Sequence, residues 1–316
     1  MPTKLLCLGE ALIDVVEQGG ATTEHVGGSL LNVTCGLATL GHDATIQAWF
    51  GRDERGERLR TWAQESGAKL APGTDGASRT PVAYAQLDEH GRATYTFDIE
   101  WQLGTLPEAG AYDHLHTGSI AATLEPGGTQ VVEAVRRQRS TGTVSYDPNI
   151  RPSLMGSPEA VRGRVEELIG LSDLVKASDE DLEWLYGEEP LERTVRRLKA
   201  LGPAMVVITR GPWGAVAALA GDDDTLHLDQ VNVTVADTVG AGDSFMAGLI
   251  SGLVDAGLLG SRAAAERLAS AKWSDVQPAL HRAVGTSAIT VSRNGAYAPG
   301  LAEVTELLAN RPAFDD

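Results

Sequence analysis

Residues 237–248 read DTVGAGDSFMAG, and this stretch decides how the chain folds. Gly240 and Gly242 let the backbone turn sharply, and the apolar residues that follow them predict a helix starting near Gly242. The unpaired backbone N–H groups at such a helix start bind anions without a basic side chain. We expect Asp243 to lie exposed in the first turn beside a bound anion, where it either accepts a proton or merely caps the helix.

Apolar strands alternate with helical segments through the rest of the chain. Strands are predicted at residues 5–8 and 12–16 and within TVSYDPN (143–149), AMVVITRG (204–211) and QVNVTV (230–235), and helices at 158–170 and 191–201. This alternation indicates an α/β fold of three layers, in which a mostly parallel sheet is covered by helices on both faces.

One segment interrupts the alternation. Residues 81–97, PVAYAQLDEHGRATYTF, predict two short strands joined by a turn at residues 88–91. Together with the strand at 12–16, this hairpin would form a small sheet that projects from the main body. We therefore expect a single domain over residues 1–316, with lid excursions at about 11–27 and 81–102.

Composition and charge exclude several classes of function. The 316 residues are 42% hydrophobic, enough for a large core, and carry a formal net charge of −17. This charge repels nucleic acid and anionic membranes, so local groups must hold any phosphate that binds. The chain has two cysteines, and we see no export signal or membrane-spanning stretch, which predicts a soluble cytoplasmic protein.

Other stretches offer ligand groups, and each also has a plainer structural interpretation. VGGSLLN (26–32) allows close backbone approach, and the Asn32 amide suits a polyhydroxyl ligand, unless it is a core amide after a glycine turn. Asp14 is either a ligand contact or an exposed residue of an edge strand. Arg151, in DPNIR (147–151), offers donors to a phosphate or is a surface arginine in a proline turn.

The loops after the predicted strands point to one crevice. KASDED (176–181) and TRGPWG (209–214) also follow apolar strands, so four strand ends would carry polar or glycine-rich loops at one edge of the sheet. The chain has no P-loop, dinucleotide-binding or protein-kinase motif. His114 and His116 lack a third partner at recognisable spacing, which makes zinc a poor candidate.

In order and spacing, these motifs resemble the ribokinase-like sugar kinases, also called the PfkB carbohydrate kinase family. The matching stretches are GG with Asn32 at 27–32, GRDERG at 51–56, DPNIR at 147–151 and DTVGAGDSFMAG at 237–248. The resemblance covers nearly the whole chain and implies a ribokinase-like fold with ATP as the phosphoryl donor. It further implies an anion hole at Gly240, Ala241 and Gly242, with Asp243 as the catalytic base.

The resemblance also implies the remaining ligand contacts, which are sugar contacts at Asp14, Gly27, Gly28, Asn32 and Phe97, a phosphate contact at Arg151, and nucleotide-side contacts at Asn149, Ser178, Thr209, Gly211 and Gly214. The family's Asn-x-x-Glu motif, which helps to organise Mg²⁺ and the phosphates, appears here as Ser178-Asp179-Glu180-Asp181, so Asp181 takes an indirect metal role. A monovalent cation such as K⁺ is implied near Asp237.

The choice of sugar depends on the predicted lid. The DPN-x-R stretch is more similar to fructokinases and 2-keto-3-deoxygluconate kinases than to adenosine kinases. Kinases for the keto-deoxy acid need a cation for its carboxylate, but TYTFDIEWQLG (94–104) offers Asp98 and Glu100 and no arginine. A neutral ketose, fructose first, is therefore favoured. The alternatives are 2-keto-3-deoxygluconate kinase and a non-catalytic sugar-binding regulator, and the exposed edge of the small sheet would permit a homodimer.

Overall fold

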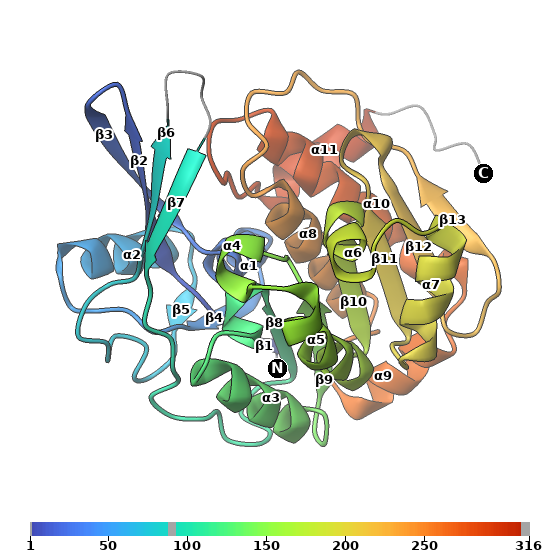
Figure 1. Cartoon of the computed structure of the whole chain (residues 1–316). Helices are drawn as coiled ribbons and strands as arrows, with labels where there is room; N and C mark the ends of the chain where they lie inside the picture. The colour runs from blue at the N-terminus through green and yellow to red at the C-terminus, as the bar shows by residue number, and fades with distance from the viewer. Residues whose placement is uncertain (1, 88–92, 311–316) are drawn as a thin grey trace.

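The computed structural model of the chain describes residues 2–87 and 93–310 (Figure 1). A nine-stranded sheet forms its centre, in the order β13 (Thr225–Leu228), β12 (Ala215–Leu219), β11 (Met205–Thr209), β10 (Leu174–Ser178), β9 (Thr143–Asp147), β8 (His114–Gly118), β1 (Lys4–Leu8), β4 (Asp43–Gln47) and β5 (Lys69–Leu70). Its pairings are parallel except those of β12 with its two neighbours. The carboxyl ends of the parallel strands therefore meet at one edge.

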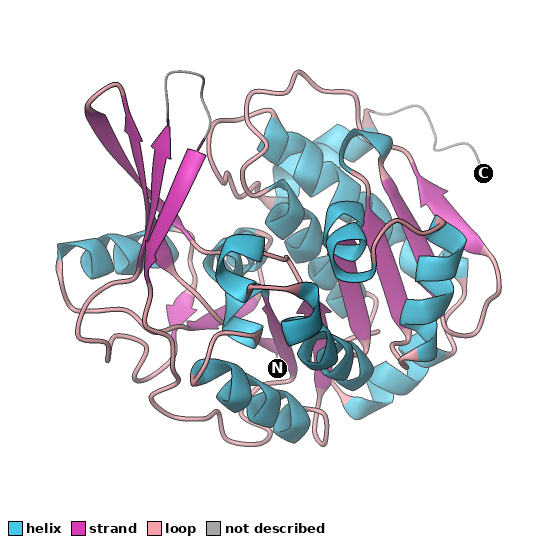
Figure 2. Ribbon diagram, viewed as in Figure 1, coloured by secondary structure: helices cyan, strands magenta, loops and turns pink. Residues whose placement is uncertain are grey.

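Helices cover both faces of this sheet (Figure 2). Successive residues of β1 point to opposite faces, so Leu5 and Cys7 share a core with the helices of one face and Leu6 and Leu8 with those of the other. The first face carries α1 (Ser29–Thr39), α8 (Ala241–Asp255), α9 (Arg262–Ala269) and α10 (Trp273–Val291), and the second α3 (Gly127–Gln138), α5 (Pro158–Leu171), α6 (Asp179–Tyr186) and α7 (Leu191–Ala200). The predicted three-layer fold and both predicted helices are confirmed.

Shorter or peripheral elements complete the chain. They are α2 (Glu54–Glu65), α4 (Pro152–Met155) and α11 (Leu301–Ala309), and the 3₁₀ turns Ser119–Ala122 and Gly211–Trp213. None of the helices formed by residues 2–87 and 93–310 combines the length and the apolar character that crossing a bilayer requires.

A second, four-stranded sheet projects from the main body (Figure 1). Its order is β3 (Ala21–Gly27), β2 (Leu12–Gln18), β6 (Val82–Leu87) and β7 (Ala93–Asp98). The predicted hairpin is confirmed, because β6 and β7 pair antiparallel, while the predicted turn at 88–91 lies outside the described residues. Glu24 of β3 forms ion pairs with Arg55 and, at 2.6 Å, with Arg58 of α2, which tie the small sheet to the body.

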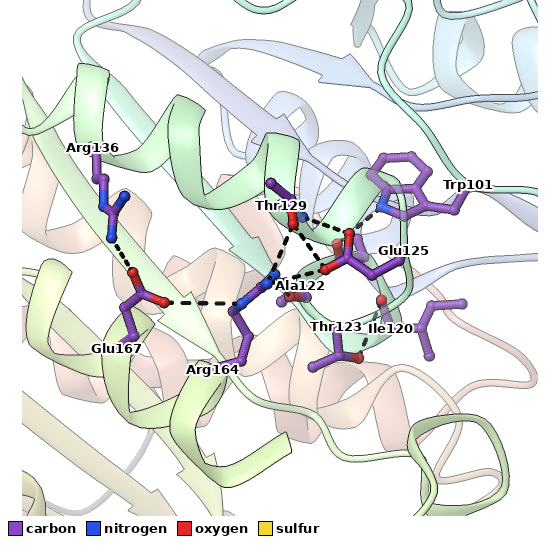
Figure 3. A network of polar contacts seen from close by, with 10 residues as sticks. Trp101, Ile120, Ala122, Thr123, Glu125, Thr129, Arg136, Arg164 and Glu167 are labelled. Carbon is purple, nitrogen blue, oxygen red and sulfur yellow. Dashed lines mark hydrogen bonds and ion pairs between the residues drawn. The ribbon is translucent and has the colours of Figure 1, made fainter. Parts of the chain in front are cut away.

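A buried tryptophan anchors the chain where it returns from the small sheet (Figure 3). Trp101 is 3% exposed, and its indole Nε1 donates a hydrogen bond to the Ala121 carbonyl at 2.9 Å. Close by, Glu125 accepts hydrogen bonds from Thr129 and from Arg164, the latter at 3.0 Å. Exposed ion pairs of this kind contribute roughly 0–1 kcal/mol. The buried indole therefore attaches this segment to the body, together with Leu103, which exchanges hydrogen bonds with Gln130.

The prediction of a strand at residues 230–235 is wrong. The outermost strand at this end of the large sheet is β13, and residues 231–235 form no ladder with it or with any other described strand. Val231 and Val233 pack against the core, whereas Val235 is 60% exposed. Alternate burial here arises from a loop that runs over the core, which produces the same period of two as a half-buried strand.

Candidate active site

Asp243 lies in the first turn of α8, as predicted, but its side chain is buried and not exposed. The residue is 9% exposed, and both carboxylate oxygens accept hydrogen bonds from α1. Ser29 Oγ donates to Oδ1 at 2.6 Å, and Asn32 Nδ2 donates to Oδ2 at 2.8 Å. Two donors from one helix therefore fix the orientation of the carboxylate.

Small residues of α1 and α8 allow the helices to approach closely enough for these contacts. A Cβ atom added at Gly36 of α1 would lie 2.7 Å from Cβ of Ala247 in α8. On the other side of α8, a Cβ atom at Gly252 would lie 2.4 Å from Cα of Ala279 in α10. A larger side chain at Gly36 would push α1 away from α8, and one at Gly252 would push α10 away from it, so small residues on both sides of α8 set the position of Asp243.

The N-terminus of α8 has the features of an anion site. Its N-cap residue is Gly240, whose φ of 75° lies in the left-handed region and where a Cβ atom would come within 2.8 Å of Ala296. No side chain caps the helix, and the Ala241 N–H is used in a turn with the Thr238 carbonyl at 3.2 Å. The first-turn amides that follow, at Gly242 and Asp243, are free of intrahelical partners and point toward the space beyond the helix end.

The predicted sugar contacts lie on the small sheet and at the start of α1, the helix whose Asn32 contacts Asp243. A Cβ atom at Gly27 would lie 2.0 Å from Asp14 Oδ2, so the carboxylate lies directly against this glycine. Gly28 is the N-cap of α1, with a φ of 108°, and packs on the backbone of Glu10. In the small sheet, Asp14 pairs with Ala83, which pairs with Phe97. Paired residues share a face of a sheet, so Asp14 and Phe97 occupy one row on the same face.

Charge and burial also affect Asp14. Burial raises the pKa of its carboxyl, and the positive charges of His25 and Arg151 oppose this rise. Arg151 likewise opposes the rise in the pKa of Glu10. The Nη1 group of Arg151 donates a hydrogen bond to the Ile150 carbonyl at 3.0 Å. The guanidinium thus acts on the carboxylates of the sugar side, and its predicted contact with the phosphate stays a prediction.

Glu10 is a site residue that the motif analysis missed. It lies two residues after Leu8, the last residue of β1, and is 6% exposed, and its Oε1 accepts a hydrogen bond from the Ser29 N–H at 3.3 Å. Oε2 has no hydrogen-bond partner among the described residues. Burial raises the pKa of Glu10 to about 7, although the nearby Ser119 hydroxyl and the charge of Arg151 act to lower it. The signal available in the sequence was an acid at the carboxyl end of a core strand, where ligands of parallel sheets bind.

Ser178 and Asp181 form a capping box at the start of α6. Ser178 Oγ accepts from the Asp181 N–H at 3.0 Å, and Asp181 Oδ2 accepts from the Ser178 N–H at 3.0 Å. Asp181 Oδ1 also accepts from the Ile150 N–H at 2.7 Å, which ties α6 to the DPNIR loop. In that loop Asn149 adopts a φ of 39°, and its buried Nδ2 has no partner within the described parts of the chain. Both Asp181 oxygens hold backbone groups, which fits an indirect role.

The remaining nucleotide-side candidates lie further along the same edge. Thr209 pairs with Ser178 across β10 and β11. Gly211 and Gly214 have positive φ angles of 49° and 76° and flank Trp213, which is 75% exposed. The loops after the parallel strands β9, β10 and β11 therefore lie at one edge of the sheet, as predicted, whereas the predicted strand before Gly240 is not formed. A single crevice at this edge stays a prediction.

The histidine pair of β8 has a structural role. His114 and His116 are fully buried in β8, where burial lowers the pKa of each to about 3, and both accept or donate hydrogen bonds with Ser145. Among residues 2–87 and 93–310, no group of three or more His, Cys, Asp or Glu side chains is placed to hold a metal ion.

Lys176 is the second site residue that the motif analysis missed. It lies in β10, is 4% exposed, and its Nζ donates to Asp147 Oδ2 at 2.9 Å. Burial disfavours its charge, but Asp147, with Asp181 and Asp243, raises the pKa of Lys176 above its ordinary value. The signal was a lysine inside the apolar strand LVKAS, because a charge in a strand covered on both faces requires a partner.

Comparison with known proteins agrees with this geometry. Residues 2–303 match the model of the pfkB family carbohydrate kinases. The chain belongs to this family. It is 35% identical to the fructokinase of Klebsiella pneumoniae over 82% of this chain and 87% of that protein. The pfkB family kinase described here is therefore an enzyme that phosphorylates a sugar.

Solved structures of family members share the fold. The fructokinase of Vibrio cholerae with fructose, ADP and calcium superposes with a TM-score of 0.78 at 25% identity, covering 97% of this chain and 99% of that one. The aminoimidazole riboside kinase of Salmonella enterica, with its riboside and an ATP analogue, gives 0.80 at 25% identity, covering 97% of this chain and all of that one, 100%. The family architecture is thus present from end to end.

Proposed function

We propose that the protein is an ATP-dependent fructokinase that transfers the γ-phosphoryl group to a primary hydroxyl of fructose. The observation that carries this proposal is the Asp243 carboxylate, fixed by Ser29 and Asn32 at the uncapped N-terminus of α8. The 35% sequence identity of the chain to a fructokinase supports fructose as the sugar.

Asp243 accepts the proton of the attacking hydroxyl, and the resulting oxygen forms the bond to the γ-phosphorus as the bond to ADP breaks. The amides at Gly242 and Asp243 and the guanidinium of Arg151 stabilise the charge that develops on the transferred group. Asp14, Gly28 and Asn32 line the sugar side. In this proposal the sugar and the ATP phosphates are held by two different groups of residues that meet at the Asp243 carboxylate.

Mg²⁺ fits this site as an ion carried by the phosphates of ATP. Magnesium usually keeps several waters and takes one or two carboxylates together with substrate phosphates. Asp147 Oδ1 is buried and has no partner among the described residues, so it can accept a hydrogen bond from a metal-bound water. When bound, the ion neutralises charge on the phosphates. A monovalent ion such as K⁺ would lie near Asp237, whose carboxylate accepts from the Val239 and Gly295 N–H groups at 3.0 and 2.9 Å.

The small sheet would serve as the lid. Asp14 and Phe97 share one of its faces, so a sugar held by Asp14 would be covered as the sheet closes. Closure excludes water, which otherwise competes with the sugar as the phosphoryl acceptor. The edge strands β3 and β7 leave a homodimer through this sheet as a further expectation. A cytoplasmic location is likewise an expectation of this proposal.

One contact keeps 2-keto-3-deoxygluconate as the alternative substrate. Asp98, expected to repel a sugar acid, is paired with Arg79 at 2.5 Å. The Asp98 charge is therefore largely compensated, and a cation is present beside the small sheet. The preference for a neutral sugar then depends mainly on the similarity to fructokinases and on the remaining acids Asp14 and Glu10.

A coupled ADP-release assay tests the function. We expect fructose to stimulate ADP release with a higher kcat/KM than 2-keto-3-deoxygluconate, and little ADP release without sugar. A higher kcat/KM for the sugar acid would assign the alternative substrate. Sugar binding by calorimetry without any sugar-stimulated ADP release would instead identify a non-catalytic sugar-binding regulator and refute the proposal.

A further inference from the structure

A buried cation lies beneath the predicted anion site. The Lys176 and Asp147 side chains are 5% and 3% exposed and form an ion pair at 2.9 Å. An ammonium group has three N–H donors, and Asp147 is the one acceptor that the described residues provide to it. Two donors of a nearly inaccessible lysine therefore remain for another acceptor.

The ammonium is packed against the glycine turn. A Cβ atom added at Gly242 would lie 3.0 Å from Lys176 Nζ. Gly242 belongs to the first turn of α8, whose free amides form the anion site described above. The lysine therefore approaches this turn from the sheet side, while Asp243 faces α1.

The surrounding charge makes a cation necessary here. Asp147, Asp181 and Asp243 all act electrostatically on Lys176, and the whole chain carries a net charge of −17. A triphosphate approaching three carboxylates is repelled unless a positive charge offsets them, and at low dielectric this effect is strong. Helix amides alone supply only about half a charge.

We propose that Lys176 is a positioning residue for the nucleotide, whose charge, held under Gly242 by Asp147, lets the ATP phosphates reach the N-terminus of α8. The proposal rests on the kinase function proposed above and extends it to a residue outside the sequence motifs. Asp147 holds the ammonium through Oδ2, and its Oδ1 is left for the metal-bound water proposed above.

The test compares three variants by calorimetry with a non-hydrolysable ATP analogue and by steady-state kinetics. Lys176→Met removes the charge but leaves Asp147 buried and unpaired, which itself destabilises the fold. Lys176→Met/Asp147→Asn removes both charges and restores the balance. Asp147→Asn keeps the cation and removes one acid. Lys69→Met is the matched control, because Lys69 pairs with Asp43 at 2.7 Å but is 64% exposed.

We expect the double variant to fold with near wild-type thermal stability and to bind the analogue at least tenfold more weakly, with the KM for sugar unchanged. Lys69→Met should retain analogue affinity within about threefold, and Asp147→Asn, which keeps the cation and an oxygen acceptor, should lose less affinity than the double variant. Wild-type affinity in the double variant, or a double variant that does not fold, would show a purely structural pair and overturn the proposal. Wild-type binding of the analogue checks the proposed function separately, because the variants are compared only with each other and with wild type.

Discussion

Replacing Asp243 by asparagine tests the central residue of the site. The substitution keeps the shape of the side chain and removes its capacity to accept a proton. General-base catalysis contributes typically 10²- to 10⁴-fold, so we expect kcat to fall by about that factor, or about 3 to 5 kcal/mol in the activation barrier. Binding of sugar and nucleotide should persist, because the surrounding donors and the glycine turn are unchanged.

The effect on stability follows from the two hydrogen bonds of the carboxylate. Ser29 Oγ and Asn32 Nδ2 donate to it at 2.6 and 2.8 Å. An amide oxygen can keep one of these bonds, and the serine hydroxyl or the unpartnered Asn32 Oδ1 can turn to accept from the new NH₂ group. Exchanging two charge-assisted bonds for neutral ones costs about 2 kcal/mol, partly offset because a buried amide is less costly than a buried charge.

Three measurements decide the outcome: ADP release with fructose, calorimetry with each ligand, and urea unfolding. Asp275→Asn is the control, since Asp275 is a first-turn carboxylate of α10 that accepts from the Lys272 N–H at 2.9 Å. Asp275→Asn should lose no more than about 1 kcal/mol of stability, as expected for an exposed capping residue, and keep its turnover. Near wild-type turnover in Asp243→Asn would show that the residue is only a structural acceptor and would refute the mechanism.

Other substitutions test the neighbouring groups. Ser29→Ala removes one of the two donors that orient the Asp243 carboxylate, so kcat should fall while the KM values for sugar and ATP change little, and an unchanged kcat would limit Ser29 to packing. Arg151→Ala should raise the KM for ATP or lower kcat, because a charge-assisted contact contributes about 1.5 to 3 kcal/mol. Loss of sugar affinity alone would place Arg151 with Asp14. Burial raises the pKa of Glu10 from 4.5 to about 7, so its contribution to stability is complete below pH 4.5 and is lost as the pH rises through 7. In urea unfolding, the free energy of unfolding of Glu10→Gln should therefore exceed that of wild type by up to about 3 kcal/mol at pH 8 and by little at pH 4.5. An equal difference at both pH values would contradict the conclusion that Glu10 is protonated when buried.

Local patterns in the sequence were sufficient for the architecture and for the outline of the site. Hydrophobic period and length identified the strands at 5–8 and 143–147 and the helices at 158–170 and 191–201, because each element buries its own apolar face. The glycines of DTVGAGDSF located the start of α8, since only a left-handed residue makes that turn. Parallel strands then bring their loops to one edge.

Only the tertiary structure decided what surrounds each polar side chain. Asp243 is buried because Ser29 and Asn32 reach it from a helix more than 200 residues away in the sequence, and no local pattern encodes that contact. The same holds for Lys176 beneath Gly242. Burial and partner charges depend on elements packed together from distant parts of the chain, so spacing along the sequence selects the residue types of the site, and packing determines their protonation, orientation and partners.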